Sequence, residues 1–251
     1  MDKAITGTDW LRVLRADPAA RHQLVCFPPG GGSATAYREL ARHFGSGVTI
    51  AAVQPPGRQD RVGDPALGDL HDLADHIAAE LLRQAPLAGL SLFGHSMGAT
   101  VAYETAVRLE RGGQPLGTLF VSGRPAPTFA EPGRFHLGSD DELIGDLERL
   151  ANDPASVAIL RSEPSLAELV LPTVRTDYQA VETYVHRSAD PLHCDIEVLV
   201  STGDPTVHPD QAAEWREHTS GGYRLHTFSG GHFYLDEQSA AVAKVIAGAL
   251  G

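Results

Sequence analysis

The strongest chemical signal in the sequence is a serine between two glycines, in the pattern Gly-x-Ser-x-Gly at residues 94–98. An apolar run typical of a buried strand precedes it, and an amphipathic segment typical of a helix follows it. A serine on the sharp turn between a strand and a helix is exposed to substrate, and the helix N-terminus stabilises the negative charge that develops during attack. The pattern alone occurs by chance, and a serine in an ordinary turn is the alternative. Its context predicts that Ser96 is a nucleophile.

A serine hydroxyl needs a base before it can attack at neutral pH. In the fold that places a nucleophile on such a turn, an acid and then a histidine follow the serine along the chain, each just beyond a late strand. Asp204 directly follows an expected strand at 195–203, and His232 directly follows one at 223–228. We therefore expect a catalytic triad in which His232 is the base of Ser96 and Asp204 orients His232.

Other titratable residues compete for these two roles. Asp195 opens its strand, at the wrong end of the sheet, and Asp210 is placed to cap or begin an expected helix at 211–218. We expect His208 and His218, on either side of that helix, to be solvated. The histidines excluded by chain order, or by a place within a strand, are His22, His43, His71, His76, His136, His186 and His226.

A glycine-rich loop, Pro29-Gly30-Gly31-Gly32, follows the apolar run at 22–28. It lacks the Lys-Ser/Thr end of a phosphate-binding loop and the spacing of a dinucleotide fingerprint. In a hydrolase, such a loop supplies one backbone N–H for the oxyanion, and the residue after the nucleophile supplies the other. Because proline has no N–H, we expect an oxyanion hole made by Met97 N–H and the N–H of Gly30 or a neighbour.

Strands that alternate with helices must position these residues. The expected strands are 22–28, 47–57, 90–93, 118–123, 195–203 and 223–228, and the expected helices are 69–84, the segment between Ser96 and Gly112, 211–218 and 239–250. The alternation predicts an α/β protein of the α/β-hydrolase type, with a mostly parallel sheet and helices on both faces.

One interval does not fit this alternation. Residues 125–190 separate two expected strands, whereas a crossover between parallel strands needs only about a dozen residues. The interval leaves the sheet at the carboxyl end of a strand, where ligands bind in such folds. We therefore expect a single domain with a core of residues 1–124 and 191–251 and an inserted helical lid at 125–190. A helical spacer without a role at the site is the alternative.

Three helical patterns lie within the expected lid. Ser139 and Glu142 form a capping box at the start of the first, and residues 154–162 carry the second. The third runs over about 165–185, and we expect it to be interrupted or kinked at Pro172. Apolar residues of these helices are expected to divide between packing and lining a substrate chamber. They include Leu143, Ile144, Leu147, Val157, Ile159, Leu160, Leu169 and Val170.

The composition limits the class of protein. With 251 residues, 42% of them hydrophobic and 21% charged, the chain is typical of one globular domain with a substantial core. Its net charge of -12 argues against nonspecific binding to nucleic acid, because a phosphate backbone would be repelled. We expect no membrane span, because no apolar run approaches about 20 residues. We expect no metal site, because no candidate ligands have a metal-binding spacing.

The expected compartment is cytoplasmic. The N-terminal segment has no long apolar core and carries acids among its bases, unlike a secretion signal. The two cysteines, Cys26 and Cys194, are far apart in the sequence. We expect two buried free thiols in a reducing environment rather than a disulfide.

Seven blocks of the sequence resemble one enzyme family. They are Cys26-Phe27-Pro28-Pro29-Gly30-Gly31-Gly32, Gln54-Pro55-Pro56-Gly57-Arg58, Gly94-His95-Ser96-Met97-Gly98-Ala99, Val121-Ser122-Gly123-Arg124, Leu171-Pro172, Asp177-Tyr178 and Gly231-His232-Phe233-Tyr234-Leu235. In content and order, these blocks resemble the type II thioesterases that accompany polyketide synthases and nonribosomal peptide synthetases. The resemblance covers nearly the whole chain, including the expected lid.

The resemblance implies a stand-alone thioesterase that hydrolyses acyl thioesters from the phosphopantetheine arm of carrier proteins, as an editor of polyketide or nonribosomal peptide biosynthesis. Its partners would be acyl or peptidyl carrier protein domains. It would need no cofactor, because the substrate carries the arm. The sequence departs from the family near the acid, where Gly-Asp-x-Asp-Pro is common. Here Ser201 and Thr202 replace the first Gly and Asp, and Asp204 falls on the second Asp.

Three other functions are compatible with the same residues. An esterase acting on free small-molecule acyl esters would use the same triad. A carrier-binding subunit without activity would keep the fold, although it would have no need for all three catalytic residues. An acyl transferase or cyclase would pass the acyl group to a nucleophile other than water.

Carrier recognition poses an electrostatic problem, because carrier proteins are typically acidic and this chain carries -12 itself. Like charge should slow the encounter, so binding must depend on local features at the mouth of the site. A guanidinium suits the phosphate of the arm, and the candidate phosphate-binding residues are Arg58, Arg61, Arg124 and Arg134. Surface ion pairs are the alternative, with acids such as Asp60, Asp64 and Glu131. The residues expected to bind substrate are Phe27, Pro29, Arg58 and Arg124.

Overall fold

The computed structural model describes residues 4–251, and their strands form one seven-stranded sheet in the order β1-β3-β2-β4-β5-β6-β7. The strands are β1 (Leu11–Arg15), β2 (His22–Phe27), β3 (Val48–Val53), β4 (Leu90–His95), β5 (Thr118–Ser122), β6 (Asp195–Ser201) and β7 (Tyr223–Phe228). Only the pair of β1 and β3 is antiparallel in this sheet. The expected mostly parallel sheet is confirmed.

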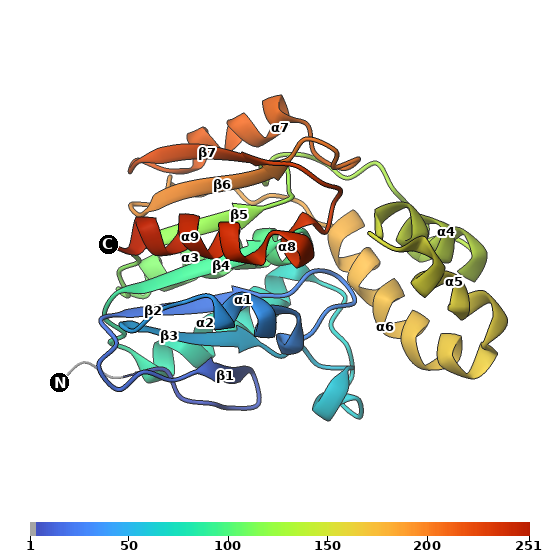
Figure 1. Cartoon of the computed structure of the whole chain (residues 1–251), viewed down its shortest axis with the longest axis horizontal. Coiled ribbons are helices and arrows are strands. Elements are labelled where there is room, and N and C mark those ends of the chain that lie inside the picture. The colour runs from blue at the N-terminus through green and yellow to red at the C-terminus, as the bar shows by residue number, and fades with distance from the viewer. Residues whose placement is uncertain (1–3) are drawn as a thin grey trace.

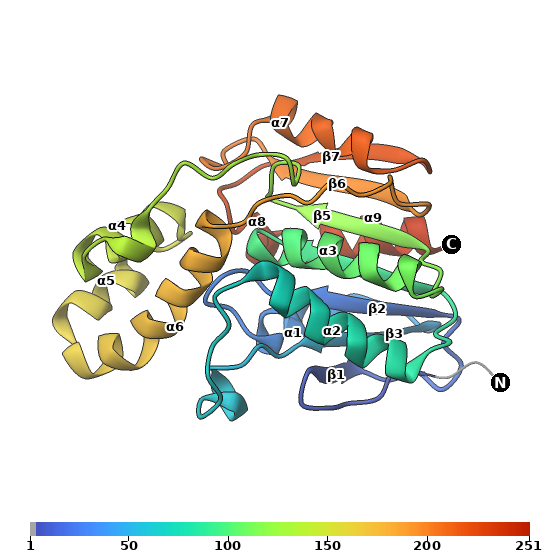
Figure 2. The ribbon, with the colours of Figure 1, turned by 180° about the vertical axis from the view of Figure 1, so that it is seen from behind.

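Helices cover both faces of the sheet. Figure 1 shows α1 (Arg38–Arg42) and α9 (Ser239–Leu250) in front of it, and Figure 2 shows α2 (Leu70–Gln84) and α3 (Met97–Arg111) on the opposite face. The bounds of α2, α3 and α9 agree closely with the helices expected at 69–84, after Ser96 and at 239–250. The strong apolar stripe of each long helix explains why the sequence already marked them.

The alternation of side chains along β2 shows how the two faces are buried. Leu24 and Cys26 pack in the apolar cluster that contains residues of α1 and α9, whereas Val25 and Phe27 pack in the cluster that contains residues of α2 and α3. All four side chains are fully buried. A strand covered on both faces is a continuous apolar run, which is the pattern that the sequence has here.

β1, α1 and α8 (Tyr234–Glu237) are short elements that were not expected from the sequence. β1 is an edge strand that pairs Leu11 with Val53 and Arg15 with Ile50. Its sequence mixes apolar and charged residues, because only part of an edge strand is covered. α1 has five residues and follows a 3₁₀ turn at Ala34–Tyr37. A helix this short has too few turns for its apolar period to be recognised.

The helix expected at 211–218 is divided. α7 (Pro209–Ala213) is followed by a 3₁₀ turn at Glu214–His218, and Asp210 lies in the first turn of α7 as expected. The prediction that His218 is solvated is wrong, because its ring packs against Tyr103 and Trp215 and is 8% exposed. Burial, followed by the neighbouring charge of a second histidine, lowers the pKa of His218 to about 4.

Three helices occupy the interval between β5 and β6. They are α4 (Asp140–Leu150), α5 (Pro154–Ser162) and α6 (Pro164–Glu182). Figure 1 shows them beyond the sheet, at the side where the parallel strands end. They share a small apolar core of their own, formed by Leu143, Ile144, Leu160, Leu171 and Val174. The expected helical insertion is therefore a separate layer rather than an extension of the sheet.

Local signals set the ends of these helices. The Ser139 side chain accepts the N–H of Glu142, whose carboxylate accepts the N–H of Ser139 in return, so the expected capping box is present. α6 runs without interruption through Pro172. The helix persists across the proline because the buried side chains of Leu171 and Val174 hold it against the other helices.

Both cysteines are buried and free, as expected. Burial raises the pKa of the Cys194 thiol to about 12, and it also raises that of Cys26, so neither side chain is a thiolate at neutral pH. Within residues 4–251, no helix combines the length and the apolar character required to cross a bilayer.

Candidate active site

Ser96 lies on a tight turn between β4 and α3, with φ 54° and ψ -125°. This is a strained backbone conformation for a residue with a side chain. The two glycines of the motif permit it. A Cβ on Gly94 would lie 2.2 Å from the Gly98 carbonyl oxygen, and a Cβ on Gly98 would lie 2.1 Å from the Phe27 carbonyl oxygen. The glycines of the Gly-x-Ser-x-Gly motif are therefore required by close backbone contacts between strand, turn and helix.

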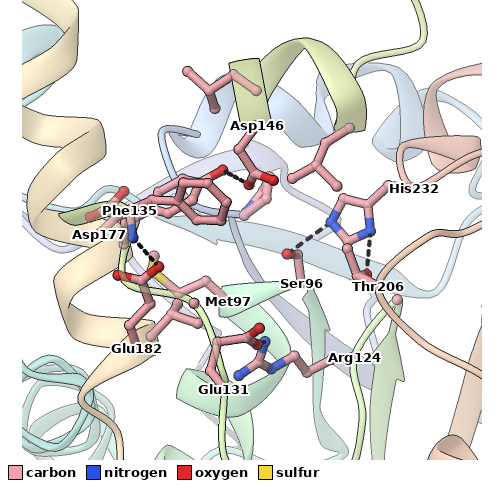
Figure 3. Close-up of a pocket in the computed structure, with 18 of the residues that line it drawn as sticks. Ser96, Met97, Arg124, Glu131, Phe135, Asp146, Asp177, Glu182, Thr206 and His232 are labelled. Atoms are coloured by element: carbon pink, nitrogen blue, oxygen red, sulfur yellow. Dashed lines mark hydrogen bonds and ion pairs between the residues drawn. The ribbon is translucent and has the colours of Figure 1, made fainter. Parts of the chain in front are cut away.

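Three side chains from different turns meet at this serine. His232 Nε2 lies 2.9 Å from Ser96 Oγ, and His232 Nδ1 lies 2.9 Å from Asp204 Oδ2. Figure 3 shows the imidazole pointing at the serine. The three residues follow β4, β6 and β7, whose carboxyl ends lie at the same edge of the sheet. The structure therefore brings together the serine, the histidine and the acid that chain order predicts.

The environment of Asp204 keeps it ionised. Burial alone would raise its pKa, but hydrogen bonds from His232 and Thr206 lower the pKa below its ordinary value. Thr206 donates its N–H and its hydroxyl to Asp204 Oδ1, at 2.8 and 2.7 Å, and its Oγ lies 3.1 Å from His232 Nδ1. Thr206 was not among the site residues expected from the sequence. A signal was present, because an aspartate two residues before a hydroxyl residue is typical of an Asx turn.

The rival acids lie elsewhere. Asp195 begins β6 at the end of the strand opposite to Asp204, and its carboxylate accepts the N–H of Gly222. Asp210 is exposed in the first turn of α7. Asp204 is therefore the carboxylate that the fold places against His232.

A buried histidine lies directly behind the site. The His95 ring lies 5.1 Å from the His232 ring, and its Nδ1 lies 2.9 Å from Ser122 Oγ, which is itself 2.6 Å from Tyr234 OH. Burial, followed by the neighbouring charge of His232, lowers the pKa of His95 to about 3. The His95 ring therefore stays neutral at physiological pH, and only His232 is available to accept a proton from Ser96.

Two backbone N–H groups beside Ser96 are available to an oxyanion. In the glycine loop, Gly31 N–H donates to Asp177 Oδ2 at 2.7 Å, and Gly32 N–H donates to the Pro29 carbonyl at 2.9 Å. Among the described residues, Gly30 N–H and Met97 N–H have no hydrogen-bond acceptor, and both residues line the pocket that contains Ser96. The geometry thus selects Gly30 from the neighbours that the sequence left open.

The expectation that Arg58 binds substrate needs correction. Its guanidinium is 9% exposed and forms two hydrogen bonds with Asp177, at 2.6 and 2.8 Å, and one with the Gly32 carbonyl at 3.0 Å. All of these contacts are internal. Arg58 and Asp177 instead fix the glycine loop against α6, because Asp177 accepts N–H donors from both. Sequence patterns contain no signal for a pair 119 residues apart.

Of the other residues expected to bind substrate or phosphate, some line the pocket and some do not. Phe27 is fully buried between the sheet and the helices α2 and α3, away from the pocket, so its assignment to substrate binding is also wrong. Pro29 and Arg124 line the pocket. Arg124 forms an ion pair of 2.9 Å with Glu131. Arg61 pairs at 2.7 Å with Asp64. Both arginines thus form ion pairs with acids that the alternative named, although Arg124 is buried rather than at the surface. Arg134 is exposed.

The pocket beside Ser96 has a volume of about 120 Å³. One wall comes from the core and includes His232 and Thr206, and the other comes from the insertion. The apolar lining residues of the insertion are Phe135, Leu147, Leu150 and Val181. Of the eight apolar residues expected to divide between packing and lining, Leu147 lines the described pocket. Leu143, Ile144 and Leu160 pack in the insertion core, and Ile159 and Leu169 are exposed.

Charged groups of the insertion that reach the pocket each have partners. Asp146 accepts the Tyr178 hydroxyl at 2.7 Å and Arg149 Nε at 2.9 Å. Glu182 accepts the N–H of Phe135 at 2.8 Å. Burial, followed by the Asp146 charge, raises the pKa of Tyr178, so its hydroxyl remains a donor. These bonds hold the insertion wall in a defined position over Ser96.

Comparison with known proteins identifies the family. The model of the Thioesterase domain matches residues 22–250. The chain is 39% identical over 247 residues to the probable cadicidin biosynthesis thioesterase of Streptomyces griseus, a match that covers 98% of this chain and 67% of that protein. It is also 39% identical to thioesterase PikA5 of Streptomyces venezuelae, over 91% of this chain and 81% of that protein.

Solved structures agree with the sequence comparison. The structure of the type II thioesterase BorB from the borrelidin biosynthetic cluster superposes with a TM-score of 0.88 at 40% identity, over 98% of this chain and 100% of that chain. The match includes the sheet and the helical insertion. The chain therefore belongs to the thioesterase domain family and is a thioester hydrolase with the α/β-hydrolase fold, similar in sequence and structure to type II thioesterases.

Proposed function

We propose that this protein hydrolyses acyl groups from the phosphopantetheine arm of acyl or peptidyl carrier proteins in polyketide or nonribosomal peptide biosynthesis. The hydrogen-bonded series Ser96, His232 and Asp204 carries the proposal, because it joins a nucleophile, a base and an orienting acid beside a pocket. The names of the relatives, a cadicidin biosynthesis thioesterase and a type II thioesterase of a biosynthetic cluster, support the substrate class.

The first step transfers the acyl group to the enzyme. Ser96 Oγ attacks the thioester carbonyl while His232 Nε2 takes its proton, and the negative charge on the carbonyl oxygen is stabilised by the N–H groups of Met97 and Gly30. Asp204 accepts the Nδ1 proton of His232 and stabilises the imidazolium. The C–S bond then breaks, and His232 gives its proton to the leaving thiolate.

The second step uses water. His232 deprotonates a water molecule, which attacks the acyl-serine, and the proton then returns to Ser96 as the free acid leaves. The reaction requires no cofactor from the enzyme, because the substrate brings its own arm. The cytoplasm is the proposed compartment, since the two free thiols persist where disulfides are reduced.

The test is intact-protein mass spectrometry of carrier proteins loaded with different acyl groups. Incubation with the enzyme should remove the acyl mass from the carrier, and Ser96→Ala should slow the loss by about 10⁴-fold or more. A short incubation should also add the acyl mass to the wild-type enzyme and not to the variant. Faster cleavage of a matched free oxygen ester than of the carrier thioester would favour the esterase alternative and contradict the proposal.

A further inference from the structure

A second hollow lies near the loop that follows β2, which also contributes Gly30 to the catalytic pocket. It has a volume of about 690 Å³ and lies between β1, the segment Ala34–Arg42, and the loop that follows β3. We call it the arginine groove, after four of its lining residues: Arg12, Arg15, Arg38 and Arg42. Neither β1 nor α1 was expected from the sequence, so these arginines were not among the candidates for partner recognition.

The charge of the arginine groove is opposite to that of the molecule. The whole chain has 32 acidic and 20 basic residues, whereas the lining of the groove contains four arginines and a single acid, Asp60. A concave surface lined by one sign of charge concentrates the local field. Because salt at physiological concentration screens charges beyond about 8 Å, a partner seated in the groove experiences mainly these arginines rather than the distant acids.

Two of the four arginines retain capacity for an incoming acceptor. Arg12 pairs with Asp60 at 2.6 Å, and Arg42 pairs with Glu39 at 2.7 Å. Arg38 is exposed and has no ion pair or hydrogen bond from its side chain to any residue of the described chain. Arg15 donates to the Gly45 carbonyl, but its Nε is buried and has no acceptor among residues 4–251. Neither Arg38 nor Arg15 forms an ion pair within residues 4–251, so the positive charge of both is not neutralised by an acid at ion-pair distance.

The loop that follows β2 contributes Gly30 to the catalytic pocket and Ala34 to the arginine groove. Gln54 and Asp60 of the loop after β3 line the groove, while Arg58 of the same loop holds Asp177, which lines the pocket. Ala34, another lining residue, donates its N–H to Gln54 at 3.3 Å and lies four positions after Gly30. A protein seated in the groove therefore contacts the loop whose Gly30 lines the pocket.

We propose that the arginine groove is the docking surface for the carrier protein, through an acidic face of that protein. The inference rests on the proposed function, which requires a protein-bound substrate. It also resolves the electrostatic problem of two acidic proteins, since a local patch of opposite charge steers encounter even when the net charges repel. A long polyanion such as nucleic acid fits less well, because its charge would extend past the groove over the acidic surface.

The test reverses charge at the two exposed arginines of α1, Arg38 and Arg42. Arg38→Glu/Arg42→Glu is compared with Arg21→Glu/Arg83→Glu, which changes the net charge equally at the far end of the sheet. The pairs are matched, because each joins an exposed arginine without a described partner to one that pairs with a glutamate three residues earlier, Glu39 or Glu80. Thermal unfolding of both variants establishes that they are folded.

The measured quantity is KM for an acyl-carrier substrate at low salt, with a small acyl thioester as the internal reference. The groove variant should raise KM for the carrier substrate about tenfold relative to the reference, and the far-end variant less than about twofold. Added salt should raise KM of the wild type and should have little effect on the groove variant. Lysines replacing acids on the carrier should restore the KM of the groove variant.

Other outcomes overturn the proposal. Equal effects of the two variants, or an equal rise in KM for the small thioester, would show that the carrier does not use the arginine groove. Tight binding of a short oligonucleotide by the wild type, lost in the groove variant, would assign the groove to another ligand. The proposed function fails separately, if the wild type cleaves the small thioester and leaves carrier-bound acyl groups intact.

Discussion

The catalytic pocket and the arginine groove are both lined by residues that follow β2, yet they differ in size and in the state of their polar groups. The pocket measures about 120 Å³ and the groove about 690 Å³. Beside the pocket, His232 and Asp204 are 2% and 6% exposed and are bonded to each other. In the groove, Arg38 is exposed and one nitrogen of Arg15 lacks an acceptor.

The pocket and the groove differ because proton transfer and recognition of a partner place different demands on polar side chains. Proton transfer requires atoms held within hydrogen-bond distance, so the side chains of the pocket are buried and their bonds are satisfied by other protein groups. Recognition of a partner surface requires charge that is not already neutralised, so the groove stays open. Changes in the pocket should therefore act on kcat and on stability, and changes in the groove on KM and its salt dependence.

The largest effect is expected at the acid of the pocket. Asp204→Asn keeps the shape of the side chain but favours the wrong tautomer of His232, so kcat should fall by about 10⁴-fold. The matched control is Asp210→Asn, at an exposed position in α7, which should change kcat by less than about twofold. Steady-state hydrolysis of a small acyl thioester measures both. A large loss in the Asp210 variant alone would move the acid to that residue.

The buried ion pair beneath the glycine loop should come next. Asp177→Ala leaves the Arg58 charge buried without a partner, so the free energy of unfolding should fall by about 3–5 kcal/mol. Urea unfolding measures this loss. kcat should fall as well, because Gly31 N–H loses its acceptor and the adjacent Gly30 N–H loses its fixed position.

A double variant separates these two effects. Arg58→Met/Asp177→Leu replaces the pair with apolar residues of similar volume and should recover most of the stability. It should not recover kcat, because no carboxylate then holds the loop. Recovery of kcat together with stability would mean that the pair acts on folding alone.

The pH dependence of stability tests the burial of His95. Its pKa is about 3 in the folded protein, below the ordinary value of 6.5, so the unfolded chain binds the additional proton between these values. The stability that depends on a neutral His95 is therefore fully present above pH 6.5 and is lost as the pH falls toward 3. Proton uptake by His95 in the unfolded chain should therefore lower the free energy of unfolding by about 2 kcal/mol when the pH falls from 7 to 5.

Urea unfolding at both pH values provides the measurement. His95→Asn should reduce the loss on acidification, whereas His208→Asn, at an exposed histidine, should leave it unchanged. An identical loss in the wild type and in the His95 variant would show that other groups, such as His218, account for the acid lability.

The smallest effect concerns the insertion wall of the pocket. Leu147→Phe adds volume beside Ser96, so it should penalise a longer acyl group relative to acetyl by about 1 kcal/mol for each methylene that no longer fits. Ile159→Phe, at an exposed position of α5, is the control. The ratio of kcat/KM for two chain lengths measures the effect. A uniform loss for all chain lengths would limit the insertion to a structural role.

The sequence predicted the catalytic half of this comparison well. The strand at 223–228 and the helix at 239–250 have the bounds that the sequence indicated, because each has a strong local period or a clear stop signal. Asp204 and His232 were found from their places directly after strands. Thr206 was missed, because its role depends on hydrogen bonds to both of them rather than on a strand end.

The arginine groove was not predictable in this way. Arg12 and Arg15 lie on an edge strand with no clear alternation, and Arg38 and Arg42 lie on a helix of five residues. Their proximity arises because β1 pairs with β3, a register that places the strand beside α1. Arg58 illustrates the same limit, because its partner Asp177 lies on the insertion.

The sequence by itself determined the nucleophile turn. Gly94 and Gly98 are required there by backbone atoms of the turn and of a neighbouring strand, and that requirement can be recognised from residue types within five positions. Only the tertiary structure decided which N–H of the glycine loop stays free, which arginines are neutralised and which gather in a groove. The physical reason is that backbone strain and periodicity are local properties of the chain, whereas the partner of a charged side chain depends on which distant segments pack beside it.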